Sequence, residues 1–223
     1  MLNSQDQIIN AANYYRALLS PQLTQSETVA GCLAAKSSAI TGIFVKPCYV
    51  RQAVNSLRRS DIMIGTVIGY PHGGKSKYAL IAETKRALTE GAQMLLLSIH
   101  PGYLIEGNFT DLNAEIQSIC GLAHMNGAQA FSLIDPEHLS ETHIASFRDN
   151  KINDTIDGIF VVTSSERGIG ETVPIIAKLA EGLSTLTKIG ILCDRFTLDE
   201  QVAYINAGCS SFISEKVSSK TCD

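Results

Sequence analysis

Short apolar segments alternate with longer amphipathic segments along most of the chain. Seven apolar segments have the length of strands and are rich in Val, Ile, Leu and Phe without strict alternation, which is typical of parallel strands buried on both faces. They span Gly42–Pro47, Met63–Tyr70, Met94–His100, Ala128–Asp135, Gly158–Ser164, Lys188–Asp194 and Ser211–Glu215. We expect an eighth strand near Ala17–Leu19, after an N-terminal helix that begins at about Ser4.

The amphipathic segments between these strands predict helices. The clearest cover Lys77–Glu90, Leu112–Met125, Thr142–Asp149, Ile169–Leu183 and Leu198–Ala207. This repetition of strand and helix within 223 residues predicts an α/β protein, a single (β/α)8 TIM barrel over residues 1–223 with a shortened C-terminal end. An open doubly wound sheet fits less well, and periodicity alone does not decide between the two.

Composition and charge argue against several classes of partner. Eighteen Lys and Arg against 22 Asp and Glu give a net charge of -4, without a basic block, so we expect no nucleic-acid partner. The chain lacks an apolar run near the ~18–20 residues that cross a bilayer, and its start is polar with Asp6, so we expect a cytoplasmic protein without membrane contact. The six Cys form no C-x-x-C pair or His cluster, so we expect no metal and no cofactor; Cys222 is the thiol we expect to be exposed.

In a (β/α)8 barrel, function lies on the loops that follow the strands. Polar residues at the predicted strand ends therefore form the candidate mouth. Its ligand-binding candidates are Lys46, Ser98, Asp135, Ser164, Asp194, Glu215 and Lys216. His100 is a tentative general base, because histidine titrates near neutral pH, although a loop histidine with satisfied hydrogen bonds is the commoner case.

One stretch of the mouth matches a nucleotide-binding motif. GYPHGGKS, Gly69–Ser76, reads as the phosphate-binding loop G-x-x-x-x-G-K-[ST], between a predicted strand and a predicted helix. Pro71 argues against this interpretation because it stiffens the loop and removes one backbone N–H donor. A nucleotide binder is therefore the least favoured of the functions we consider.

Several blocks, in order along the chain, resemble the 2-deoxyribose-5-phosphate aldolase family. They are LLSP (18–21), IFVKPCYV (43–50), TVIGYPHG (66–73), GAQMLLLSIHPGYLIEGN (91–108), FVVTSS (160–165) and TLDEQVAYINAG (197–208). The resemblance implies a class I aldolase with a TIM-barrel fold, often a homodimer. In this family the segment after the third strand is an ordinary turn, so the match at Gly69–Ser76 is interpreted as accidental.

The resemblance fails at the residues that perform the family's chemistry. It implies a Schiff-base lysine on the sixth strand, a second lysine on the seventh and an aspartate on the fourth. Aligned without gaps, these positions hold Val162, Gly190 and Leu96, none of which can attack a carbonyl or carry a proton. Asp194 and Glu215 stand where the resemblance implies a phosphate site, and their charges would repel a phosphate.

Two functions remain open from the sequence. The first is a catalytically inactive aldolase-like protein, a pseudoenzyme that binds a small molecule or a protein and serves as a regulator or scaffold. The second is an aldolase or lyase with a relocated nucleophile, Lys46, acting on a small aldehyde or sugar phosphate. Lys46 would be reactive if it faced apolar walls such as Leu96 and Val162; we favour a charged Lys46 paired with Asp135, Asp194 or Glu215.

Overall fold

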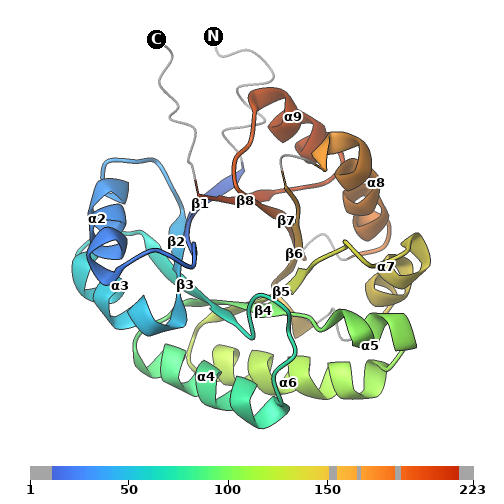
Figure 1. Ribbon diagram of the computed structural model, residues 1–223, viewed down its shortest axis with the longest axis horizontal. Helices are drawn as coiled ribbons and strands as arrows, with labels where there is room; N and C mark the ends of the chain where they lie inside the picture. The colour runs from blue at the N-terminus through green and yellow to red at the C-terminus, as the bar shows by residue number, and fades with distance from the viewer. Residues whose placement is uncertain (1–11, 151–154, 165–166, 184–186, 216–223) are drawn as a thin grey trace.

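Eight parallel strands close into a barrel in chain order in the computed structural model, which describes residues 12–150, 155–164, 167–183 and 187–215 (Figure 1). The strands are β1 (Asn13–Leu18), β2 (Gly42–Val45), β3 (Met63–Ile68), β4 (Met94–Ser98), β5 (Gln129–Ile134), β6 (Gly158–Val162), β7 (Lys188–Cys193) and β8 (Ser211–Ser214). The predicted (β/α)8 barrel is confirmed, and the open sheet is wrong because β1 pairs with β8.

The predicted strands are all present, and most end one or two residues earlier than their apolar runs. The strand expected near Ala17–Leu19 begins four residues sooner, at Asn13, because polar Asn13 and Arg16 concealed its first half. The expected N-terminal helix from about Ser4 and the end of the chain after Glu215 lie outside the described residues.

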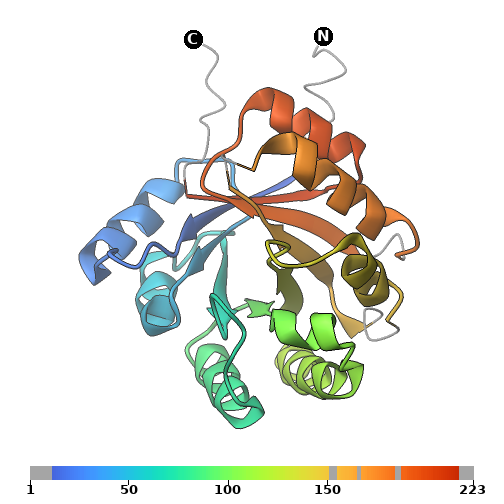
Figure 2. The ribbon, with the colours of Figure 1, turned by 45° about the vertical axis from the view of Figure 1, so that its right-hand side comes forward.

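A ring of helices surrounds the barrel (Figures 1 and 2). They are α2 (Gln25–Ala35), the short 3-10 helix η1 (Pro47–Tyr49), α3 (Val50–Ser56), α4 (Lys77–Thr89), α5 (Pro101–Glu106), α6 (Phe109–Met125), α7 (Glu141–Arg148), α8 (Gly168–Ala180) and α9 (Leu198–Asn206). Local sequence fixes several of their starts: Thr24 and Thr197 form capping boxes with Glu27 and Glu200, which satisfy backbone N–H groups of the first turn. The helices therefore hold each strand in place from outside.

Alternate residues of each strand face either the helices or the barrel interior. The outward residues join the helices in one hydrophobic layer, and the inward residues form a second cluster inside the barrel. This inner cluster consists of Tyr15, Ala17, Leu19, Phe44, Val67, Met94, Leu96, Phe131, Leu133, Phe160 and Ile213. The barrel is thus a packed core rather than a pore, as expected for eight strands.

Glycines on neighbouring strands make room for the largest rings of the inner cluster. A Cβ atom added to Gly65 would lie 2.5 Å from a ring carbon of Phe44, and one added to Gly190 would come closer than 3.0 Å to three ring carbons of Phe160. Each glycine pairs directly with its aromatic partner across the parallel ladder. The aromatic rings consequently occupy the volume that side chains at positions 65 and 190 would fill.

Five cysteines lie in the described part of the chain. Four are buried, but Cys48 is exposed, whereas the sequence led us to expect exposure at Cys222. It lies in η1, on the outside of the barrel between β2 and α3, where the chain turns outward after Lys46. Cys222 lies outside the described residues.

Candidate functional site

The strand register brings the candidate residues together at the C-terminal end of the barrel. In a (β/α)8 barrel, inward residues of alternate strands form layers across the axis. One such layer consists of Phe44, Leu96, Phe160 and Ile213. The residues two positions further along the same four strands are Lys46, Ser98, Val162 and Glu215. Asp135 and Asp194 likewise lie two positions after Leu133 of β5 and Leu192 of β7, which belong to the other set of alternate strands. We call this end the mouth.

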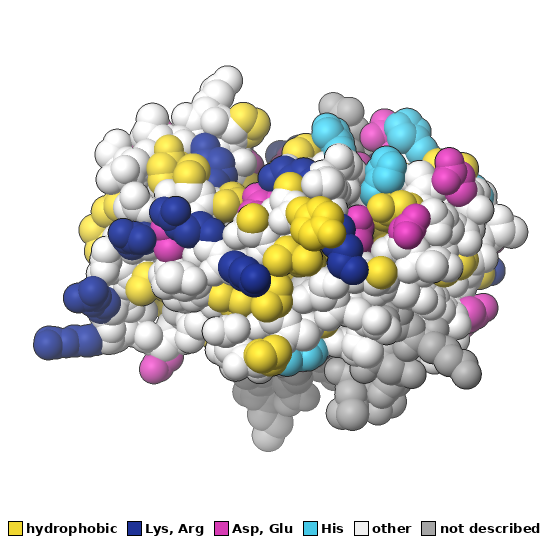
Figure 3. All heavy atoms as spheres, turned by 90° about the horizontal axis from the view of Figure 1, so that it is seen from below, with side chains coloured by type: hydrophobic (Ala, Val, Ile, Leu, Met, Phe, Trp, Pro, Cys, Tyr) yellow, Lys and Arg dark blue, Asp and Glu magenta, His cyan; other side chains and the backbone are white. Residues whose placement is uncertain are grey.

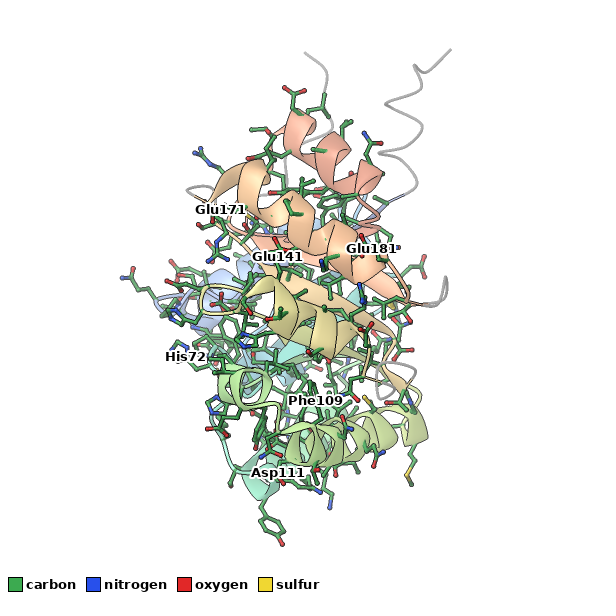
Figure 4. All side chains as sticks on the ribbon, turned by 90° about the vertical axis from the view of Figure 1, so that its right-hand side faces the viewer. His72, Phe109, Asp111, Glu141, Glu171 and Glu181 are labelled. Atoms are coloured by element: carbon green, nitrogen blue, oxygen red, sulfur yellow. The ribbon has the colours of Figure 1, made fainter. Side chains whose placement is uncertain are left out.

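The side view in Figure 4 shows the two ends of the barrel. His72, which follows β3, lies at the mouth end, as does Glu171 near the start of α8. Glu181, the residue after α8, lies toward the opposite end, because each helix runs antiparallel to the strands. The candidate mouth therefore coincides with the end at which TIM-barrel enzymes hold their active sites.

The three positions that the family resemblance marks as catalytic lie in a hydrocarbon environment. Leu96 is fully buried in the inner cluster, Val162 packs against the same cluster, and Gly190 lies under the ring of Phe160. Tyr15 is the one titratable residue of the inner cluster among the described residues, and burial raises its pKa to about 12. It therefore stays a neutral phenol near pH 7.

Lys46 binds backbone carbonyl groups instead of the expected carboxylates. Its Nζ donates to the carbonyl oxygens of Ser20 (3.1 Å), Pro21 (3.2 Å) and Leu23 (2.7 Å), in the loop after β1. The ammonium also lies 5.3 Å from the ring centroid of Tyr49. This arrangement ties the loop to the end of β2 and turns the amine away from the apolar walls considered from the sequence.

A second amine approaches the interior from the far end of the barrel. Lys188 begins β7, two residues before Gly190, and its Nζ lies 5.9 Å from the ring centroid of Phe131. Sequence reasoning missed this residue because it considered strand ends at the mouth, whereas alternation along β7 already placed Lys188 on the inward face. Lys188 lies below the aromatic layer, on the side opposite the candidate residues of the mouth.

Ser98 and His100 lie on either side of the boundary between strand and helix. Ser98 is buried at 4 % exposure, and its Oγ has no hydrogen-bond partner among the described residues. His100 is exposed and precedes α5, where its ring makes an edge contact with Tyr103 at 5.4 Å between centroids. Tyr103 in turn donates to Glu115 Oε1 (3.0 Å), whose pKa is raised by burial. His100 is thus packed toward α5, whereas Ser98 faces the mouth.

Tyr70 lies at the mouth, two residues after the end of β3. It packs against the inner cluster, and its pKa is raised first by burial and then by the negative charges of Glu215 and Asp135. Asp135 also accepts the backbone N–H of Glu137 at Oδ1 (3.0 Å), which fixes its side chain after β5. The raised pKa keeps the phenol of Tyr70 neutral near pH 7.

The remaining ligand-binding candidates make local contacts. Ser164 is exposed, and its Oγ accepts the backbone N–H of Arg167 (3.3 Å). Asp194 Oδ1 accepts from the thiol of Cys193 (3.1 Å). Lys216 lies outside the described residues. Ser164 and Asp194 are both exposed and lie on the rim of the mouth.

The motif at Gly69–Ser76 has the strand and helix that a phosphate-binding loop requires, but a carboxylate of the chain occupies its donors. Glu83 Oε2 accepts the N–H of Gly69 (2.9 Å), and both Glu83 oxygens lie 3.0 Å from Lys75 Nζ. An internal anion therefore already binds the amide and the ammonium that would meet a nucleotide phosphate.

A groove of about 290 Å³ lies on the outer flank of the barrel, where η1 and α4 meet. It is lined by Pro47, Cys48, Glu83, Arg86, Ala87 and Glu90. Lys and Arg side chains gather on the α3 side of this flank (Figure 3), and Arg51 and Arg86 both pair with the buried carboxylate of Glu90. The basic residues here are partly neutralised by this internal acid.

Within the described ranges, His, Cys, Asp and Glu side chains form no group of three that could hold a metal ion. Over the same ranges, the helices are too short or too polar to span a membrane.

Comparisons with known proteins place this barrel among its relatives. No family model matches the chain. The deoxyribose-phosphate aldolase of Treponema denticola is 27% identical over 194 residues, which cover 86% of this chain and 89% of the relative. That of Staphylococcus saprophyticus is 29% identical over 172 residues, covering 77% and 76%. The chain is a relative of the deoxyribose-phosphate aldolases.

Solved structures agree with this aldolase relationship at the level of the fold. A Coccidioides immitis protein assigned as a deoxyribose-phosphate aldolase superposes with a TM-score of 0.82 at 21% identity, over 93% of this chain and 82% of that one. The deoxyribose phosphate aldolase of Aeropyrum pernix, described as a tetramer, gives a TM-score of 0.78 at 17% identity, over 96% and 89%. This aldolase-like chain thus keeps the barrel of its relatives through large sequence divergence.

Proposed function

We propose that this aldolase-like barrel has lost Schiff-base chemistry and acts as a pseudoenzyme. It binds a small molecule or a protein partner through its mouth and its flanks, in a regulatory or scaffolding role. In this proposal the chain is related to the aldolases, and it lacks their Schiff-base chemistry because of the residues at three positions, Leu96, Val162 and Gly190.

The packing at Gly190 is the observation that carries the proposal. A reactive lysine at this position would need to enter the barrel interior, where the ring of Phe160 leaves no space for even a Cβ atom. Phe160 is itself held by edge contacts with Phe131 (5.4 Å between centroids) and Tyr15 (6.5 Å). This packing supports the proposal, because the ring of Phe160 fills the volume that a lysine at position 190 would need.

The charge of the mouth also argues against the phosphate ester that the names of the relatives indicate. Asp135 and Glu215 both act on Tyr70, and the one lysine of this layer, Lys46, is bound by three carbonyl groups. A phosphate dianion would meet carboxylates at short range without a described ammonium free to offset them.

Reductive trapping tests the proposal directly. The protein is incubated with 2-deoxyribose 5-phosphate or acetaldehyde, reduced with borohydride and measured by intact mass, with the Treponema denticola relative as the positive control. We expect a stoichiometric adduct on the relative and none on this chain, because the described residues of the mouth include no lysine buried against apolar walls.

A stoichiometric adduct that maps to one lysine would refute the proposal. An adduct at Lys46, lost in Lys46→Arg, would establish the relocated nucleophile; one at Lys188 would reveal access from the opposite end of the barrel. Cleavage of 2-deoxyribose 5-phosphate well above the uncatalysed rate would contradict the proposal equally.

A further inference from the structure

The mouth combines an apolar floor with polar groups that converge on the barrel axis. Val162 and Leu192 are partly buried and pack against the inner cluster, which gives the floor its hydrocarbon character. Ser98 and Glu215 follow inward-facing residues of the same set of alternate strands, and Asp135 follows one of the other set. A molecule seated on this floor would therefore meet these three side chains together.

Ser98 provides an observation that is independent of the carboxylates. It is more than nine-tenths buried, and alternation after Met94 and Leu96 directs its side chain toward the axis. Its hydroxyl has no hydrogen-bond partner among the described residues. Because buried hydroxyl groups are normally hydrogen-bonded, this one indicates a partner that binds from the mouth.

The charge around the floor is negative. Asp135 and Glu215 make no ion pair with a described residue, and both follow inward-facing strand residues at the mouth. The negative charges of both carboxylates contribute to the raised pKa of the Tyr70 phenol. The ring of Tyr70 packs against the same apolar cluster. Two carboxylates beside an aromatic ring form an environment that attracts an ammonium group, by charge and by the electrons of the ring.

We propose that the mouth binds a small organic cation, an ammonium compound with a short hydrocarbon body and a hydroxyl or carbonyl group. The ammonium lies beside Asp135, Glu215 and the ring of Tyr70, the body rests on Val162 and Leu192, and the polar group bonds to Ser98 Oγ. This inference rests on the proposed function, because it makes the mouth a binding site. An organic cation is favoured over a metal ion by the apolar floor and by the lack of a metal-ligating group among the described residues.

Three five-carbon probes that differ at one end test the inference by isothermal titration calorimetry on the full chain. They are 5-aminopentan-1-ol, pentane-1,5-diol and 5-hydroxypentyl phosphate. We expect the amine to bind about tenfold more tightly than the diol, and the phosphate to bind more weakly than both. None of the probes carries a carbonyl group, so binding is measured without imine formation, and this result is separate from the trapping experiment.

Matched variants locate the site. The double variant Asp135→Asn/Glu215→Gln keeps size and hydrogen-bonding groups but removes both charges, and we expect it to bind the amine no better than the diol. Ser98→Ala should weaken the amino alcohol but not pentylamine, which lacks the hydroxyl. Asp61→Asn, a change before β3 at the opposite end of the barrel, should leave the preference for the amine unchanged.

Several results would overturn the inference. They are equal or tighter binding of the phosphate, an amine preference that survives the double variant, or no binding of any probe at millimolar concentration. Calcium chloride that binds at the mouth while the amine does not would assign the carboxylates to a metal ion instead. Each of these results leaves the proposal of lost imine chemistry standing, since that proposal is tested by reductive trapping and by cleavage of 2-deoxyribose 5-phosphate.

Discussion

Substituting Gly190 by alanine tests the packing on which the proposed function depends. The added methyl group would overlap the ring of Phe160, which is 1% exposed and in edge contact with Phe131 and Tyr15. The ring cannot turn away without disturbing these two contacts. Gly190→Ala therefore forces either a shift of β7 or a rearrangement of the aromatic layer.

The expected cost follows from these contacts. Overpacking of a filled core costs about 1–3 kcal/mol, and each disturbed aromatic pair adds about 0.5–1.5 kcal/mol. Alanine lowers the conformational entropy of the unfolded chain, which offsets about 0.4–1 kcal/mol of this loss of stability. We expect Gly190→Ala to lower the free energy of unfolding by about 3 kcal/mol, near the middle of the range that these contributions span.

A double-mutant cycle with Phe160→Leu isolates the overlap. Phe160→Leu alone should cost about 1–2 kcal/mol through lost packing. The double variant should cost at least about 1 kcal/mol less than the sum of the single variants, because the smaller side chain admits the methyl group. Urea unfolding followed by far-ultraviolet circular dichroism measures all three, since the chain contains no Trp to report by fluorescence.

Gly121→Ala is the matched control for Gly190→Ala. Gly121 lies in α6, is exposed and has nothing within 4 Å of an added Cβ atom, so alanine should gain about 0.5–1 kcal/mol there. A cost below about 0.5 kcal/mol for Gly190→Ala, or strict additivity with Phe160→Leu, would refute the reasoning about the interior.

Four further predictions concern single side chains. Lys46→Met should cost about 1–3 kcal/mol in urea unfolding, because three loop carbonyls lose a charged donor. Mg-ATP should leave the melting temperature of the wild type and of Lys75→Ala unchanged, since Glu83 already binds the donors of the loop. Iodoacetamide should label Cys48, as read by peptide mass, but not the four buried thiols, whose pKa values burial raises to about 11 or 12. Burial raises the pKa of Glu115 above its ordinary 4.5, so the folded protein loses stability as pH rises from about 4.5 through the folded pKa and the carboxyl ionises. Glu115→Gln should remove this decrease in the free energy of unfolding, as measured by urea unfolding at a series of pH values.

The fold could be predicted from the sequence because each buried parallel strand is an apolar run that can be recognised locally. Runs such as Met94–Ser98 are apolar at every position except the last, since both faces are buried, and their spacing matches eight strand and helix units. The signal failed at β1, where Tyr15 and Ala17 face the interior but Asn13 and Arg16 interrupt the apolar run. It also placed strand ends too late, because apolar residues continue past the last ladder hydrogen bond into the loops.

The site was predictable in position but not in contacts. Counting residues after each strand placed Ser98, Asp135 and Glu215 at the mouth, and the register agrees. The partners of Lys46 were not predictable, because a flexible lysine reaches loop carbonyl groups whose position depends on the turn after β1. The hydrogen bond from the Gly69 N–H to Glu83 was equally hidden, since it depends on how α4 packs against the loop after β3.

The absence of a side chain at position 190 and the presence of an aromatic ring at position 160 are best understood as one feature. The two positions pair directly across β6 and β7, and a lysine at one and a phenylalanine at the other would compete for the same volume. A lysine at position 190 would therefore require a smaller residue at position 160, which would also remove the edge contacts of Phe160 to Phe131 and Tyr15. If the proposed loss of Schiff-base chemistry holds, this coupling means that a single substitution at position 190 would not supply a lysine in the barrel interior, because the aromatic layer already fills that volume.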